Sequence, residues 1–216
     1  VGIPDKNIHI VLDKQATYKG VQAGFSWLKD KTNNNPNARN FIYLNAHGGQ
    51  EPKPFQVKEE SLWTDFINRH KTHEMFVLWT EKKPPTVFDA LDSKQWMTAQ
   101  DLRKMLDPIS AEKIIIIDAC HAGLAGHDLL DYSKEIPERN KRESFLFSSM
   151  PLSISQASGK KGLALFTSYL VQSIYNKDTL ELAFQSAREY TIFKSALNVI
   201  DGIMGDCILT DGKNFC

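Results

Sequence analysis

Two reactive side chains each stand three residues beyond an apolar segment of this 216-residue chain. His47 follows the run FIYL at 41–44, and Cys120 follows four consecutive isoleucines at 114–117. Both segments have the composition of buried strands, and in an open parallel sheet ligands bind beyond the carboxyl ends of the strands. A thiolate nucleophile needs a base or an imidazolium as its partner. The spacing therefore predicts a Cys–His pair at one edge of a sheet.

Glycines close to both residues support the same chemistry. Gly48 and Gly123 permit a close backbone approach, which an oxyanion-binding amide requires. Each residue also has an ordinary structural explanation when it is taken alone, because free cysteine often packs as a small hydrophobe and a histidine near a turn is usually structural. Together they favour a hydrolase that uses a cysteine nucleophile.

The strands that would position these residues can be located from short apolar runs. We predict buried strands at 8–12, 41–44, 114–117 and 144–149. The four isoleucines have no polar alternation, which is typical of a strand that is buried on both faces and is central in a parallel sheet.

Helices are predicted between these strands. We expect an amphipathic helix at 16–29, a short helix that begins at a capping-box-like pair, Thr98 and Asp101, and two helices around 165–170 and 180–187. Strands that alternate with helices predict an α/β domain with a largely parallel sheet and right-handed crossovers. We expect a single domain over residues 1–216.

Two stretches depart from this alternation. Residues 51–96 form a looser region that we interpret as an insertion, and residues 124–143 are strongly charged and predict an exposed linker. The linker contains several basic residues, so self-cleavage within it is one hypothesis, beside the simpler interpretation of a solvated loop.

The composition limits what the chain can bind. Lys plus Arg number 26 and Asp plus Glu number 26, so the net charge of zero gives no general field that attracts nucleic acid or an anionic membrane. No run of about 18 apolar residues occurs, so we expect no membrane span. The expected partner is a protein or peptide substrate, and the sequence predicts no oligomeric state.

The two motifs resemble those of the caspase-like cysteine peptidases, a group that includes caspases, metacaspases, legumains and gingipains. Residues 45–49 (NAHGG) look like the His-Gly motif, and residues 114–123 (IIIIDACHAG) resemble the motif that carries the catalytic cysteine. Residues 2–8 resemble the second-strand entry of legumain-like members, 97–102 the helix before the cysteine strand, and 144–174 the specificity-loop strand with its helix. The resemblance implies a three-layer α/β/α sandwich, with a first strand and helix that would precede Val1.

The resemblance also implies a role for each residue at the site. Cys120 would attack a peptide carbonyl, His47 would transfer protons, and the amides of Gly48 and Cys120 would bind the oxyanion. Asp118 would line the primary pocket, where a carboxylate favours Arg or Lys before the scissile bond; the alternative is that it caps the following turn. An edge strand of Ser148, Ser149 and Met150 would pair with substrate, unless these residues merely end a strand.

Two other functions use the same residues. A transamidase or peptide ligase would pass the acyl group to an amine, and a non-catalytic scaffold of this fold would bind a partner. The sequence predicts no metal site and no cofactor; calcium dependence occurs among metacaspase-like relatives, but no calcium loop is recognisable. Cys207 and Cys216 lie close together in the sequence, and a disulfide between them would imply an extracytoplasmic location.

Overall fold

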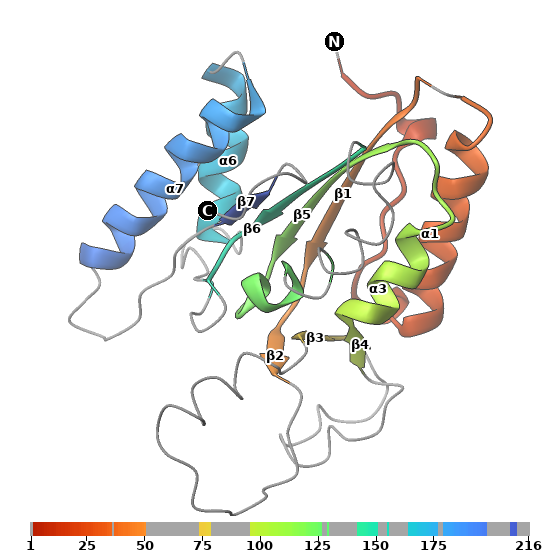
Figure 1. Cartoon of the computed structure of the whole chain (residues 1–216), viewed down its shortest axis with the longest axis horizontal. Helices are drawn as coiled ribbons and strands as arrows, with labels where there is room; N and C mark the ends of the chain where they lie inside the picture. Colours follow the sequence, from red (N-terminus) through yellow and green to blue (C-terminus); the bar gives the residue numbers. More distant parts are fainter. Residues whose placement is uncertain are drawn as a thin grey trace, which may run out of the picture.

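The structure is a computed structural model that describes residues 2–35, 37–50, 74–78, 96–126, 129, 142–150, 155, 164–176, 179–197 and 208–210. These residues form a mixed α/β fold around a four-stranded sheet (Figure 1). The sheet has the order β1-β5-β6-β7, with β1 at Arg39–Asn45, β5 at Glu112–Asp118, β6 at Glu143–Phe147 and β7 at Ile208–Thr210. The first three strands are parallel and β7 is antiparallel to β6, so the predicted, largely parallel sheet is confirmed.

Helices lie on both faces of this sheet. In Figure 1, α1 (Tyr18–Thr32) and α3 (Ala99–Leu106) lie on one side, and α6 (Leu165–Asn176) and α7 (Leu180–Leu197) lie on the other. The isoleucine run of β5 explains why helices pack on both faces of the sheet. Ile115 and Ile117 pack in the core with α1 and α3, whereas Ile114 and Ile116 pack against α6 and α7. β5 is therefore covered on both faces, as its composition predicted, with Ile115 and Ile117 fully buried and Ile114 and Ile116 partly buried.

The predicted start of α3 is confirmed in detail. The Thr98 hydroxyl accepts a hydrogen bond from the Asp101 amide at 3.1 Å, and the Asp101 carboxylate accepts one from the Thr98 amide at 3.2 Å. This reciprocal capping box satisfies two amides that the first turn would otherwise leave unpaired. The helix then buries Leu102, Met105 and Leu106 against the sheet.

A second, smaller sheet follows the end of β1. It has the order β2-β3-β4, with β2 at Gly48–Gln50, β3 at Glu74–Val77 and β4 at Trp96–Thr98, and both of its pairings are antiparallel. Two of these strands lie at least partly inside the predicted insertion at 51–96. The rest of that insertion, residues 51–73 and 79–95, lies outside the described residues.

The predicted strand at 8–12 is wrong. These residues lie between two short 3-10 helices, η1 (Asp5–Asn7) and η2 (Asp13–Gln15), and Ile8 and Ile10 are 46% and 63% exposed. An apolar run becomes a strand only where its backbone can pair with a neighbouring strand. Here the only pairing partner of β1 among the described residues is β5, and the segment packs beside α1 instead, where His9 stacks on Trp27.

The predicted exposed linker at 124–143 is wrong at both ends. Residues 122–126 are helical, and Leu124, Ala125 and Leu129 are buried because they face the core. At the other end, Glu143 begins β6 and is also buried. Residues 127–128 and 130–141, which include the proposed self-cleavage segment, lie outside the described residues.

Glu143 is buried because it belongs to an ionic cluster at the amino ends of β5 and β6. Its carboxylate accepts hydrogen bonds from two guanidinium nitrogens of Arg103 at 2.6 and 2.8 Å, and it pairs with the ammonium of Lys113 at 2.9 Å. Asp107 pairs with the Arg103 Nε. Burial alone would raise the pKa of Glu143, but the hydrogen bonds and charges of Arg103 and Lys113 outweigh it and hold that pKa below its usual value.

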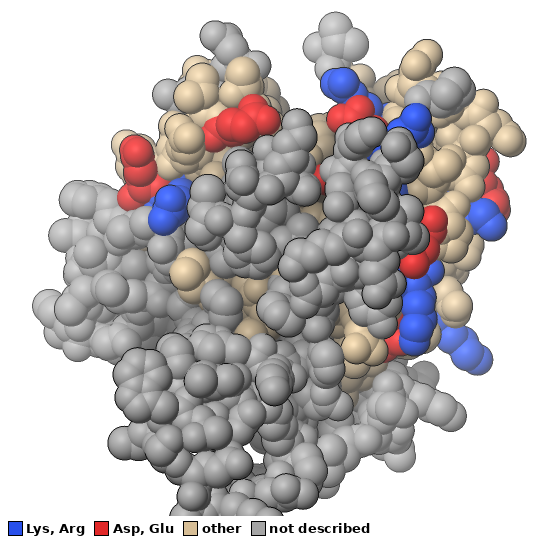
Figure 2. Space-filling model, viewed as in Figure 1, with Lys and Arg blue, Asp and Glu red and all other residues tan. Residues whose placement is uncertain are grey.

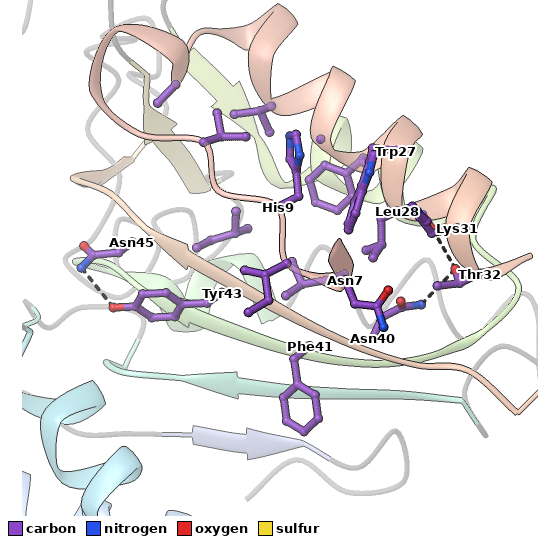
Figure 3. A pocket seen from close by; sticks show the side chains of 18 of the residues that line it. Asn7, His9, Trp27, Leu28, Lys31, Thr32, Asn40, Phe41, Tyr43 and Asn45 are labelled. Atoms are coloured by element: carbon purple, nitrogen blue, oxygen red, sulfur yellow. Dashed lines mark hydrogen bonds between the residues drawn. The ribbon is translucent and has the colours of Figure 1, made fainter. Parts of the chain in front are cut away.

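A cavity of about 880 Å³ lies between β1, α1 and the N-terminal segment (Figure 3). His9 and Trp27 stack on one side of it with their ring centroids 5.0 Å apart, and Asn45 lies on the opposite side. Neither His47 nor Cys120 lines this cavity. The cavity and the candidate site therefore share the end of β1 and two residues of β3, Phe76 and Val77.

The surface charges of the described residues are mixed. On the face in Figure 2, Lys and Arg occur in small groups close to Asp and Glu, and no broad area of one sign is visible among the described residues. None of the helices that the structure describes is long and apolar enough to cross a membrane.

Candidate functional site

The loops that carry His47 and Cys120 begin side by side. β1 and β5 are adjacent and parallel, and their register pairs Asn45 with Asp118, the last residue of each strand. His47 and Cys120 each lie two residues beyond this pair, and the amide of Ala46 donates to the carbonyl oxygen of Asp118 at 3.4 Å. The structure thus brings the two predicted catalytic residues to the same end of neighbouring strands.

Cys120 lies in a tight turn between β5 and the helical residues 122–126. It is partly buried and carries a free thiol, and its Sγ lies 3.8 Å from the carbonyl oxygen of Ser155. The next residue, His121, has a φ of 58°, in the left-handed region that residues other than glycine seldom adopt. β5 ends at Asp118, so Cys120 lies in the turn just beyond the end of the strand.

Exposed His47 connects β1 to the smaller sheet. Its carbonyl oxygen accepts a hydrogen bond from the amide of Val77 at 2.9 Å, so the residues at 47 and 77 form a hydrogen-bonded antiparallel pair. Hydrogen-bonded pairs alternate with pairs that are not hydrogen-bonded. Gly48 and Phe76 form the next pair, so the amide of each points away from the other's strand. The N–H of Gly48 therefore points away from β3, as an oxyanion donor requires.

Asp118 is a buried carboxylate at the end of β5, with 2% of its surface exposed. It accepts hydrogen bonds from the hydroxyl of Ser155 at 2.7 Å and from the hydroxyl of Thr167 on α6. Among the described Lys, Arg and His residues, none forms an ion pair with it. Ser155 contacts both Asp118 and the Cys120 thiol, so the carboxylate and the nucleophile are linked through one residue.

Tyr43 lies next to this carboxylate. Burial raises the pKa of the Tyr43 hydroxyl, and the charge of Asp118 raises it further, while hydrogen bonds from Thr167 and Asn45 act in the opposite direction. The Asn45 amide donates to the Tyr43 hydroxyl at 3.1 Å. Tyr43 is nevertheless 46% exposed, because the apolar residues of α6 and α7 pack against β5 and β6.

The three predicted substrate-binding residues after β6 separate into two kinds. The side chains of Ser148 and Ser149 are buried and hydrogen-bond to the backbone of the Cys120 turn, whereas Met150 is 38% exposed. Substrate pairing by this segment stays a prediction, and for the two serines it can involve only backbone groups.

Comparisons with known proteins add no relative: no protein-family model matches the chain, and no curated protein matches it. The motifs and their geometry are therefore the support for any function.

The residues around Asp118 that the sequence did not identify are Tyr43, Ser155 and Thr167. Tyr43 had a local signal, because strand alternation places it on the same face as Asn45, which pairs with Asp118. Ser155 and Thr167 lie 37 and 49 residues beyond Asp118, so nothing in the sequence linked them to it. No group of three or more His, Cys, Asp or Glu side chains within the described ranges could hold a metal ion.

Proposed function

We propose that this chain is a cysteine endopeptidase with a caspase-like fold that cleaves peptide bonds after Arg or Lys. The observation that carries the proposal is the register of β1 and β5. It places His47 and Cys120 at equal positions beyond two paired, adjacent strand ends. Acyl transfer needs a nucleophile and an acid-base partner close to each other, and neighbouring strand ends can supply such a pair.

In the proposed reaction, the Cys120 sulfur attacks the carbonyl carbon of the scissile bond and its proton passes to His47. The negative charge that develops on the carbonyl oxygen is stabilised by the amides of Gly48 and Cys120. The amine leaves when the C–N bond breaks and takes the proton from His47. Water then attacks the thioester, with His47 as the base, and releases the acid product and the free thiol.

The preference for a basic residue rests on Asp118. A buried carboxylate is costly unless a cation or several donors compensate it. Hydroxyl groups of Ser155 and Thr167 supply two donors, and the described residues supply no cation. A guanidinium or ammonium group from substrate would supply the missing charge, and the exposed face of Tyr43 could contact it by a cation–π interaction.

The test compares fluorogenic peptides that end in Arg, Lys, Asp or Asn, with the wild-type chain and with Cys120→Ala, His47→Ala and Asp118→Asn. We expect cleavage after Arg and Lys only, and its loss in the first two variants. His9→Ala is the matched control for His47→Ala, because His9 stacks on Trp27 in the N-terminal segment and should leave cleavage intact. Full activity in Cys120→Ala would exclude the mechanism.

The Asp118→Asn variant separates the mechanism from the specificity. It keeps the shape and one of the two acceptor oxygens but removes the charge, so kcat/KM for Arg and Lys substrates should fall about 10- to 100-fold, the worth of a charge-assisted hydrogen bond. Asp30→Asn, at an exposed position of α1, is the control. A preference for Asp or Asn in the wild-type chain would reject the pocket assignment and leave the dyad in place.

A further inference from the structure

Two buried serines lie directly behind the Cys120 turn. Ser148 and Ser149 follow β6, are 1% and 0% exposed, and direct their hydroxyls at the backbone of the turn. We propose that Ser149, assisted by Ser148, is a positioning residue that fixes this turn so that the amide of Cys120 faces the developing oxyanion. This inference rests on the proposed peptidase function.

Ser149 ties together the two sides of the turn. Its hydroxyl donates to the carbonyl oxygen of Ala119 at 2.8 Å and accepts from the amide of Ala122 at 3.0 Å. A hydroxyl has one hydrogen and two lone pairs, so a single side chain can bridge the residues before and after the turn. The Ser149 carbonyl oxygen also accepts from the amide of Gly123 at 3.0 Å.

Ser148 secures the entry to the same turn. Its hydroxyl accepts from the amide of Ala119 at 3.2 Å and lies 3.4 Å from the Ala119 carbonyl oxygen. Its own amide donates to the carbonyl oxygen of Ile117 at 3.0 Å, which continues the β5–β6 hydrogen bonding one residue beyond the end of β6. Positions 117, 119, 122 and 123 are thus all bound to the two serines.

The conformation of His121 indicates why the turn needs this support. A φ of 58° is unfavourable for a residue with a side chain, and such a conformation persists only where its surroundings impose it. The hydrogen bonds from Ser149 lie on both sides of Cys120 and His121. These hydrogen bonds fix the peptide planes of the turn, and therefore the direction in which the Cys120 amide points. None of them involves the Cys120 amide itself.

Oxyanion donors accelerate a reaction because they are oriented before the charge develops. Loss of the Ser149 hydroxyl would let the turn relax, and a displacement of about 1 Å can cost roughly 100-fold in rate. The serine touches no substrate, so its loss should lower kcat and leave KM nearly unchanged. Alkylation of the thiol involves no oxyanion and should proceed at the wild-type rate.

The experiment compares Ser149→Ala with Thr191→Val, a matched control that removes another buried hydroxyl. Thr191 donates to the carbonyl oxygen of Ala187 within α7, on the far side of the sheet from α1 and α3. Five quantities are measured on the full chain: kcat, KM, inhibition by a peptide aldehyde that ends in argininal, the rate of Cys120 alkylation by iodoacetamide, and amide hydrogen exchange of the peptide that spans 118–126.

In Ser149→Ala we expect faster exchange in that peptide, a kcat that falls about 10- to 100-fold, and an equal loss of aldehyde affinity, because the aldehyde forms a tetrahedral oxyanion on Cys120. Thr191→Val should show none of these changes. If Ser149→Ala does not fold, Ser148→Ala takes its place and should show a smaller loss of the same kind, because its bonds are longer.

Two results would overturn the role of Ser149 and leave the peptidase function in place. The first is hydrogen exchange and kcat in Ser149→Ala that match those of Thr191→Val. The second is a fall in the iodoacetamide reactivity of Ser149→Ala as large as the fall in its kcat, which would indicate a general loss of structure. A wild-type chain that cleaves no peptide would overturn the peptidase function and the catalytic part of the inference together. The two failures can therefore be distinguished.

Discussion

The ionic cluster at the amino ends of β5 and β6 makes a quantitative prediction about stability. Glu143→Gln keeps the size of the side chain but removes its charge. The variant leaves Arg103 with Asp107 as its only carboxylate partner among the described residues and removes the ion pair of Lys113, which is 3% exposed. Removing one partner of a buried ion pair typically costs about 3 to 5 kcal/mol, because a buried charge is left uncompensated.

That loss is large beside the roughly 5 to 15 kcal/mol of stability of a whole domain. With a slope of about 2 to 3 kcal/mol/M in urea, it should lower the unfolding midpoint by roughly 1 to 2.5 M. Urea unfolding followed by circular dichroism at pH 7 measures it. The control is Glu112→Gln, which breaks the Arg39–Glu112 pair on neighbouring strands. Those side chains are 70% and 43% exposed, so we expect a change below about 1 kcal/mol.

Equal midpoints for the two variants would refute this reasoning. A triple variant, with Arg103→Met, Lys113→Met and Glu143→Leu, tests it from the other side. It removes all three charges together and should recover most of the lost stability, because an apolar replacement of a whole buried ion pair is often neutral or stabilising.

Three further outcomes follow from single contacts. The pKa of Glu143 is held below its unfolded value of about 4.3, so the stability that this carboxylate contributes is complete above that pH and is lost as the pH falls through the lower, folded pKa. Acid unfolding of the wild-type chain should therefore steepen as the pH falls through the folded pKa. Glu143→Gln should lack that part of the transition. Gly126→Val should lower the free energy of unfolding by about 1 to 3 kcal/mol, because a Cβ at that position would already lie 3.0 Å from the buried ring of Phe147; an unchanged thermal midpoint would show that the ring can move. Thr98→Ala should cost about 1 kcal/mol in urea unfolding by removing the cap of α3, and no loss would mean that Asp101 caps the helix alone.

Local patterns were enough to predict much of the fold. The isoleucine run at 114–117 predicted a central strand because a strand that is buried on both faces needs no polar alternation. The capping pair at Thr98 and Asp101 predicted the start of α3 because both hydrogen bonds form within one turn. The neighbouring positions of the loops at 47 and 120 followed from these strands and the rule for parallel sheets.

Features that depend on distant residues could not be predicted. The charge of Glu143 indicated exposure, but its partner Arg103 lies 40 residues earlier and buries it. The apolar run at 8–12 indicated a strand, but the pairing neighbours that would make it one are decided by the rest of the fold. Ser149 had no distinctive local signal, because its importance comes from a turn 27 to 30 residues away.

The ionic cluster also restricts how this sequence can change over generations. Arg103 lies on α3, Lys113 on β5 and Glu143 on β6, yet the Glu143 carboxylate pairs with both cations, and all three residues are almost completely buried. Loss of the Glu143 carboxylate removes the shared partner of both cations, and loss of either cation leaves Glu143 with one cation in place of two, so variants of this chain should keep all three residues or replace them in a correlated way. By the same reasoning, residues at 39 and 112 should vary independently, because solvent can replace either partner.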